Sequence, residues 1–452
     1  MKRIKTLTIL LACCLLSFGT RAQDATYETY TLKNGLRVYL IHYGKLPALN
    51  VKLVLNTGEK NENPGQQGYS EIVANALLLG NKKYDQEAQN NMQFRLGANL
   101  SASSSKDNTT LTMNLLSRSL DEGFDLLSSV VLSPTFPKDK IELIKSQYTD
   151  FNSPSKMDIA DLADVYSDYF IYGISNPFGR YYYKNQLQKI TPEVLREYYE
   201  FNYTPKNCNL VICGNFEDGP LKATIEKYFG SWKSTYGDVN GVSMDQPVIK
   251  KKETGFINRR GATQCALQWS KTAPSVKDKD YLAFTIANKI FNVVLFKEIR
   301  EKGGKTYGIR SNYAHSQFSN LFQVSCSVRS NEMYNTMELF DKTLKNFSAG
   351  TVEEKELKKV IYEETVNIKR LEMPDAVSGF FNPLVYNFEK RKNYIADLNA
   401  LTLEDINKAI RKYFTPDSYK LVVAGDESAV KEQLQKIQGL VKFNAADIER
   451  DN

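Results

Sequence analysis

Glu71 and Asn75 lie four residues apart in a segment that the sequence predicts to be a helix from Ser70 to Leu79, ended by Gly80. A carboxylate and an amide at this spacing share one face of a helix. The opposite face carries an apolar stripe at helical spacing, made of Ile72, Val73, Ala76 and Leu77. Periodicity alone therefore favours an ordinary core helix with two polar positions.

The chain contains two histidines, His42 and His315, and neither stands near a second one. Zinc prefers imidazole nitrogens, thiolates or carboxylates, and Ser/His or Cys/His catalysis requires an imidazole beside the nucleophile. Each histidine falls in a predicted strand or loop without a nucleophile signature. An independent hydrolase with a non-zinc site is therefore disfavoured.

Length and composition indicate a globular protein of more than one domain. The chain has 452 residues, of which 42% are hydrophobic and 12% aromatic, so it can fill large cores. Its formal net charge is +7, spread along the chain without a clustered Lys/Arg run. We therefore expect a solvated surface of mixed charge and no nucleic-acid partner.

The N-terminus has the pattern of a signal peptide covering residues 1–22. Three basic residues precede an apolar run from Leu7 to Phe18, and Thr20-Arg21-Ala22 offers a cleavage site of small residues. The run is too short to span a membrane, and no later segment is long and apolar enough. We expect an exported, periplasmic chain with no integral membrane segment after signal removal; lipid attachment at Cys13 is the less favoured alternative.

Four cysteines remain after the signal. Cys208 and Cys213 are five residues apart on one predicted strand, so they point to opposite faces and cannot pair with each other. Cys265 and Cys326 are isolated among apolar neighbours. We expect four buried free thiols and no metal site built from cysteine.

Strands and helices alternate in an order that occurs twice. We predict a strand pair around Asn34-Gly35, strands at 49–56 and 109–115, a helix opened by a Ser119/Glu122 capping box and ending at Leu132, and a second long helix from Lys138. Residues at helix starts and strand ends recur at a constant offset of 211 positions. The pairs are Thr191 and Thr402, Thr204 and Thr415, Gly214 and Gly425, and Arg118-Ser119 and Arg329-Ser330. This offset indicates a duplicated unit.

The predicted fold is α+β, with two tandem homologous halves that each pack a mixed or antiparallel sheet against long helices. We expect an N-terminal domain at 23–232, a linker at 233–252 where periodicity lapses, and a C-terminal domain at 253–452.

This order resembles the pitrilysin/insulinase family of zinc peptidases, which includes the mitochondrial processing peptidase. The resemblance covers nearly the whole chain after residue 22, and four features carry it: Leu32–Val38, the Gly68–Gly80 helix, Asn176–Arg180, and the two Thr-Pro…strand-Gly endings. Family members are built from duplicated α+β halves around a central chamber, and their first half carries the zinc motif H-x-x-E-H.

Laid on this chain, the zinc motif falls on Glu71, Ala74 and Asn75. Ala74 cannot take the proton that a zinc-bound water must lose, and Asn75 offers only a weak amide oxygen. The family's third ligand, a Glu, matches best at Asp150 to Asn152, where no Glu occurs. The resemblance therefore implies a degenerate motif and no metal in this chain.

A second family signature is retained at Leu295–Gly308, and it carries over an Arg and a Tyr as Arg300 and Tyr307. A guanidinium suits a peptide carbonyl or carboxylate, and a phenol can donate to an oxyanion. The structural alternative is that Arg300 caps the end of a helix stopped by Gly303-Gly304. Phe291–Val294 replaces the Gly/Ser-rich break that usually precedes this signature.

The resemblance implies a zinc-free subunit of a heteromeric metallopeptidase, inactive alone, in which Arg300 and Tyr307 bind peptide at the zinc site of a homologous partner. The alternative is a purely structural or peptide-holding pseudopeptidase.

Overall fold

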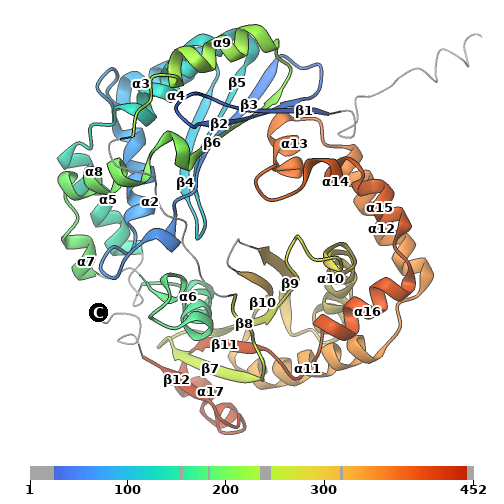
Figure 1. Cartoon of the computed structure of the whole chain (residues 1–452). Coiled ribbons are helices and arrows are strands. Elements are labelled where there is room, and N and C mark those ends of the chain that lie inside the picture. Colours follow the sequence, from blue (N-terminus) through green and yellow to red (C-terminus); the bar gives the residue numbers. More distant parts are fainter. Residues whose placement is uncertain (1–24, 152–155, 182–183, 235–245, 316–318, 445–452) are drawn as a thin grey trace, which may run out of the picture.

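The computed structural model describes residues 25–151, 156–181, 184–234, 246–315 and 319–444. Figure 1 shows that the two halves of the chain lie opposite each other and together form a ring-like molecule. Residues 1–22, predicted as a signal, and residues 235–245 of the predicted linker lie outside this part. Within the described ranges, no helix combines the length and apolar character needed to cross a bilayer.

The N-terminal half contains one six-stranded sheet, and most of its helices cover the outer side of that sheet. Its strands are β1 (Thr26–Thr31), β2 (Arg37–His42), β3 (Ala48–Leu55), β4 (Asn99–Ser104), β5 (Thr109–Leu116) and β6 (Cys208–Gly214). Its helices are α2 (Tyr69–Ala76), α3 (Gln86–Leu96), α4 (Leu120–Leu132), α5 (Lys138–Phe151), α6 (Ile159–Tyr172), α7 (Lys184–Gln188), α8 (Pro192–Asn202) and α9 (Asp218–Phe229).

The C-terminal half repeats this plan with a second six-stranded sheet. Its strands are β7 (Glu253–Asn258), β8 (Gln264–Thr272), β9 (Thr306–His315), β10 (Asn320–Arg329), β11 (Lys420–Gly425) and β12 (Val441–Phe443). Its helices are α10 (Tyr281–Leu295), the π-helix η7 (Phe296–Lys302), α11 (Met333–Ala349), α12 (Glu354–Lys369), α13 (Pro374–Phe381), α14 (Phe388–Lys392), α15 (Tyr394–Ala400), α16 (Leu403–Tyr413) and α17 (Glu427–Leu434).

The strand orders show the duplication that the sequence predicts. The first sheet runs β1-β2-β6-β3-β5-β4 and the second runs β12-β7-β11-β8-β10-β9. Five strands correspond in place, and both central strands β6 and β11 pair in parallel with the strand on one side and antiparallel with the strand on the other. The two sheets differ at one edge, which β1 closes antiparallel to β2 and β12 closes parallel to β7.

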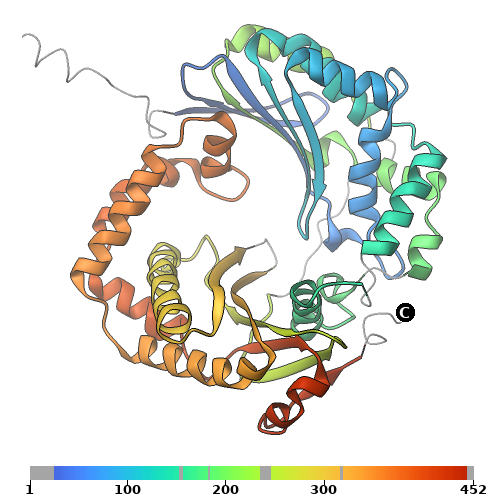
Figure 2. The same cartoon turned by 180° about the vertical axis from the view of Figure 1, so that it is seen from behind.

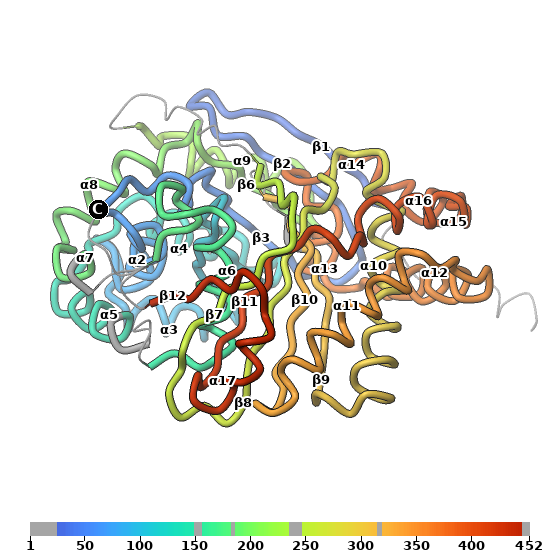
Figure 3. The backbone as a smooth tube through the Cα atoms, turned by 90° about the horizontal axis from the view of Figure 1, so that it is seen from below, coloured from blue at the N-terminus to red at the C-terminus, as the bar shows by residue number. Residues whose placement is uncertain are grey.

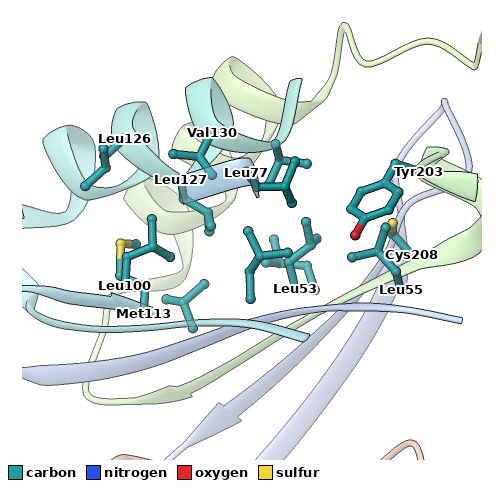
Figure 4. Packing of buried hydrophobic residues seen from close by; sticks show 14 of the residues in the cluster. Leu53, Leu55, Leu77, Leu100, Met113, Leu126, Leu127, Val130, Tyr203 and Cys208 are labelled. Atoms are coloured by element: carbon teal, nitrogen blue, oxygen red, sulfur yellow. The ribbon is translucent and has the colours of Figure 1, made fainter. Parts of the chain in front are cut away.

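The core of the N-terminal half lies between its sheet and its outer helices (Figure 4). Alternate residues of β5 are buried, because successive side chains of a strand point to opposite faces. Leu53 of β3, Met113 of β5 and Leu127 of α4 are all fully buried in this cluster. The predicted strands at 49–56 and 109–115 are therefore confirmed with bounds shifted by at most one residue.

Each half also gives one helix to the inner face of the other sheet. Helix α6 packs on the C-terminal sheet, where Tyr166 and Leu162 are buried against Val422 and Ala266. Helix α13 packs on the N-terminal sheet, where Val377 and Phe381 are among the residues buried with it. Figures 1 and 2 show both crossings, with α13 beneath the N-terminal sheet and α6 beside β7 and β11.

Threonine side chains cap two equivalent helices of the two halves, whereas the cap predicted at Ser119 does not form. The Thr191 hydroxyl accepts from the amide of Val194, and Thr402 forms a capping box with Asp405. The predicted box at Ser119 is wrong, although its helix α4 forms. Ser119 ends a 3-10 turn and makes no side-chain cap, and Glu122 pairs with Arg95.

Candidate functional site

Helix α2 begins at a buried carboxylate. Glu62 lies in the loop before the helix, and its oxygens accept from the amide of Gly68 at 3.0 Å, the amide of Ser70 at 2.9 Å and the hydroxyl of Ser70 at 2.6 Å. These are the amides that a helix start leaves without intrahelical partners. Gly68 takes a left-handed conformation, with φ of 89°, that a residue with a Cβ rarely adopts. The loop and cap therefore fix where α2 starts.

Burial also changes the acidity of this carboxyl group. Glu62 is 7% exposed, and desolvation raises its pKa to about 8 although the Ser70 and Gly68 hydrogen bonds oppose the shift. Glu59 in the same loop has its pKa raised to about 7, mainly by burial. Burial thus favours the neutral form of the Glu62 carboxyl group.

The three positions of the degenerate motif occupy consecutive turns of α2. Ala74 is fully buried, whereas Glu71 and Asn75 are half-buried. The Asn75 amide donates to the hydroxyl of Tyr148 at 2.9 Å and to the carbonyl of Glu71 at 3.0 Å. Asn75 is therefore held in place by α5 and by its own helix.

Tyr148 reaches α2 because α5 turns one face toward it. Ile141, Ile144 and Tyr148 follow helical spacing on α5, and the two isoleucines are buried in the core. Burial raises the pKa of Tyr148 well above its usual value, and the Glu71 carboxylate adds to the rise. The pKa of Tyr181 is also raised, first by burial and then by Asp161 and Glu71.

These residues do not fit a zinc ion and its water. The cluster offers one carboxylate, one amide and two neutral phenols, with no imidazole and no base beside a metal position. Across the described residues, no three His, Cys, Asp or Glu side chains gather closely enough to hold a metal. His42 is on β2, where it lies 2.9 Å from Asp218 near the surface.

Sequence reasoning missed Tyr148. The family resemblance placed the third ligand at Asp150 to Asn152, two to four residues after Tyr148. Asn152 lies outside the described residues, and so do the side chains of Asp150 and Phe151. The available signal was the apolar face of α5, since Tyr148 continues the spacing of Ile141 and Ile144 toward α2.

Arg300 and Tyr307 stand on either side of one turn in the C-terminal half. Helix α10 continues without a break into η7, so the segment that replaces the Gly/Ser-rich break is helical. The helix ends where the amide of Gly304 donates to the carbonyl of Arg300 and the amide of Lys305 donates to that of Ile299. Gly304 has a φ of 59°, and the chain then enters β9.

Both side chains point away from the core. Tyr307 is 90% exposed, and the structure records no hydrogen bond of its hydroxyl within the described part of the chain. Arg300 is exposed, and its guanidinium lies over the ring of Phe296 at 4.5 Å from the centroid. The backbone carbonyls of Ile299 and Arg300 are capped by amides of the turn, so the helix end does not depend on the guanidinium.

The structure separates the two predicted groups of residues. Glu71, Ala74 and Asn75 are on α2, while Arg300 and Tyr307 follow α10, and Figures 1 and 3 place these helices on opposite sides of the molecule. Between α6 and the inner face of the C-terminal sheet lies a cavity of about 520 Å³. It is polar, and its lining includes Asp161, Asp164, Gln268, Arg310, Asn312 and Ser325.

Comparison with known proteins gives matches in both halves. A model of the insulinase family, peptidase family M16, matches residues 37–163, and a model of the peptidase M16 inactive domain matches residues 189–362. The chain is 21% identical to the uncharacterized zinc protease YmxG of Bacillus subtilis over 86% of this chain and 96% of that protein. It is 22% identical to YmfF, a probable inactive metalloprotease of the same organism, over 67% of this chain and 73% of YmfF.

Solved structures share the fold at low identity. A peptidase M16 inactive domain from Pseudomonas fluorescens aligns with a TM-score of 0.81 at 21% identity, covering 89% of this chain and 98% of that one. The periplasmic protease PqqL from Escherichia coli aligns with a TM-score of 0.76 at 15% identity, covering 89% of this chain and 47% of PqqL. With two six-stranded α+β halves and a family match in each, the chain belongs to the M16 insulinase/pitrilysin family of peptidases.

Proposed function

We propose that this chain is a zinc-free subunit of a heteromeric M16 metallopeptidase, and that it presents Arg300 and Tyr307 to peptide bound at the zinc site of a homologous partner chain. The exposure of Tyr307 carries the proposal. A tyrosine kept for packing buries its ring, whereas this ring is 90% exposed near the start of β9.

The two side chains suit complementary tasks on a peptide. A guanidinium offers several donors in a planar fork, so Arg300 would hold a peptide carbonyl or carboxylate. The Tyr307 hydroxyl would donate to the oxyanion that develops during hydrolysis. The partner's metal would supply the activated water, for which Glu71, Ala74 and Asn75 provide neither ligands nor base.

The proposal also includes a cellular location and a partner chain. We infer export to the periplasm from the signal pattern at 1–22, in line with the periplasmic location of PqqL. The partner is an M16 chain with an intact H-x-x-E-H motif, and the ligand is an extended peptide.

The test is reconstitution of the chain with such a partner from the same organism. Tyr307→Phe should lower turnover on the order of 100-fold without changing subunit association, since it removes one oxyanion donor and keeps the ring. Arg300→Ala should mainly raise the Michaelis constant. If both variants keep wild-type kinetics, or if no zinc-bearing M16 chain associates, the proposal is refuted.

A peptide-holding pseudopeptidase is the second candidate, and the cavity beside α6 favours it. Asp161 and Asp164 stand on one wall and Arg310 on another, so the cavity offers donors and acceptors to a polar segment of peptide. This function predicts peptide binding by the lone chain together with wild-type turnover of any M16 partner when Arg300 and Tyr307 are replaced. Measuring both in one preparation separates the two candidates.

A further inference from the structure

Asn292 of α10 forms two hydrogen bonds with the backbone of a single residue in β9. Its amide donates to the carbonyl of Ser311 at 2.8 Å, and its side-chain oxygen accepts from the amide of Ser311 at 2.6 Å. The Ser311 hydroxyl in turn donates to the side-chain oxygen of Asn288, one helical turn earlier. Ser311 and Asn288 are 5% and 7% exposed and Asn292 is half-buried, so these bonds are largely shielded from solvent.

The contact replaces strand pairing at the edge of the C-terminal sheet. Strand β9 is last in the strand order, and within the described ranges its one partner is β10, where Ser311 stands opposite Val324. The amide and carbonyl of Ser311 both bond to Asn292, so they point away from β10 and toward the outer edge of the sheet. An edge strand leaves such groups open to another chain, and the carboxamide of Asn292 satisfies both at the middle of β9.

The same contact joins the two segments that carry the exposed pair. Asn292 precedes Arg300 by eight positions in a helix that continues through η7. Ser311 follows Tyr307 by four positions in one strand. At the turn itself, Lys305 pairs with Glu332 at 2.6 Å, and the Thr306 hydroxyl donates to the carbonyl of Ser327 at 2.7 Å. The strand is therefore fixed to the sheet at the turn and to the helix at Ser311.

We propose that Asn292 is a positioning residue that holds Tyr307 at a fixed place relative to Arg300 by clamping β9 to α10 at Ser311. The inference rests on the proposed function of the Arg300/Tyr307 pair and adds a residue that touches neither peptide nor metal. Loss of the clamp leaves Arg300 on its helix and β9 anchored at Lys305 and Thr306, but it releases β9 from α10 at Ser311, so the position of Tyr307 relative to the helix is less tightly fixed. The effect should thus fall on the step that Tyr307 serves.

The experiment measures kinetics in the reconstituted pair together with amide exchange in the zinc-free chain. Asn292→Leu keeps the branched shape of the side chain and removes both bonds to Ser311. We expect at least tenfold faster exchange of the Ser311 amide, about a tenfold lower kcat and a KM within about twofold of wild type, as for a misplaced catalytic group. Asn292→Asp keeps the acceptor and loses the donor, so it should give an intermediate loss if the leucine variant folds poorly.

A matched control and a double variant separate positioning from general destabilisation. Thr285→Val removes a hydroxyl that donates only within α10, to the carbonyl of Tyr281 at 2.8 Å, and should leave kcat unchanged. In a Tyr307→Phe background, Asn292→Leu should lower kcat by less than twofold further, because the group it positions is already gone.

Each other result overturns a specific part of the argument. If Tyr307→Phe lowers turnover while Asn292→Leu only accelerates Ser311 exchange, the positioning role is wrong and the proposed function stands. If Asn292→Leu lowers kcat equally in the wild-type and Tyr307→Phe backgrounds, positioning is also refuted, since the loss then does not depend on the Tyr307 hydroxyl. Unaltered turnover in Tyr307→Phe refutes the proposed function, and with it the role of Asn292.

Discussion

The side-chain amide of Asn75 donates to the hydroxyl of Tyr148 at 2.9 Å, across the contact between α2 and α5. Helices α2 and α5 therefore place the last of the three motif positions against a tyrosine. Neither side chain is one of the ligands that zinc prefers, because one is an amide and the other a neutral phenol.

Metal content is the most direct check on this site. We expect the purified chain to hold no stoichiometric zinc and to cleave no peptide, because Glu71, Ala74 and Asn75 supply neither a ligand pair nor a base. Elemental analysis after dialysis measures this. One tightly held zinc per chain that Glu71→Ala abolishes would contradict it.

The same contact predicts that zinc binding can be rebuilt. The triple variant E71H/N75H/Y148E places two histidines at i and i+4 on α2 and a carboxylate on α5 where Tyr148 now meets Asn75. We expect about one zinc per chain, measured by elemental analysis and competition with a chelator. The double variant E71H/N75H is the control and should bind more weakly, since it lacks the third ligand.

Stability should depend on pH through Glu62. Its pKa is about 8 in the folded chain against 4.5 for an ordinary glutamate, so the folded state binds the extra proton between these values. The free energy of unfolding contributed by this group is fully present below about pH 4.5 and falls as pH rises through about 8. Glu62→Gln, which cannot titrate, should therefore flatten the decline in melting temperature between pH 5 and pH 8.

An exposed glutamate supplies the control for that measurement. Glu372 lies on the surface, and Glu372→Gln should leave the pH profile as in wild type. Glu59 shifts in the same direction as Glu62, so a smaller slope should persist in the Glu62 variant. Identical slopes in wild type and Glu62→Gln would show that Glu62 is ionised when folded.

The exchange of α6 and α13 should make the halves unfold together. Phe381 of α13 is fully buried in the cluster that includes Val211 and Cys213 of the N-terminal sheet, so Phe381→Ala should lower the free energy of unfolding by about 3–5 kcal/mol. The two tryptophans report on separate halves, Trp232 on the N-terminal core and Trp269 on the C-terminal core.

Urea unfolding followed in Trp232→Phe and Trp269→Phe backgrounds measures each half alone. Phe381→Ala should shift both transition midpoints by the same amount. Phe94, which is 90% exposed, gives the matched control, and Phe94→Ala should change stability by less than about 0.5 kcal/mol. A shift confined to one reporter would mean that the halves unfold independently.

Thiol titration should count four free cysteines after cleavage at the predicted signal site. Cys208, Cys213, Cys265 and Cys326 are buried and unpaired, and burial raises the pKa of Cys326 to about 12 and that of Cys265 to about 11. We expect slow reaction of the native chain and four equivalents after denaturation without reductant. A count near zero would indicate disulfides formed on export.

Much of the fold could be predicted from the glycines and N-cap residues that begin and end helices in the sequence. Gly68 and Gly80 bracket the helical stretch of α2 and the 3-10 turn after it, and the Thr191 and Thr402 caps mark equivalent helices of the two halves. The exchange of α6 and α13 could not be predicted, because an amphipathic pattern shows that a helix has a buried face but not which sheet covers it.

The site was predictable only in part for the same reason. The motif positions on α2 follow from spacing along one helix, whereas the partner of Asn75 comes from another helix and depends on how α5 is rotated. The family resemblance placed the third ligand position at Asp150 to Asn152, but the described side chain that contacts Asn75 is Tyr148. The clamp at Ser311 depends likewise on the packing of α10 over the edge of β9.

The crossing of α6 and α13 has a meaning for how such a chain arose. Helices exchanged between two similar units are what a homodimer shows when each protomer lends an element to its twin. Here the units share one chain and the lent helices occupy corresponding places, about 211 positions apart. The molecule therefore has the form of a domain-swapped dimer contained in one chain, in which the two halves carry different residues at corresponding positions.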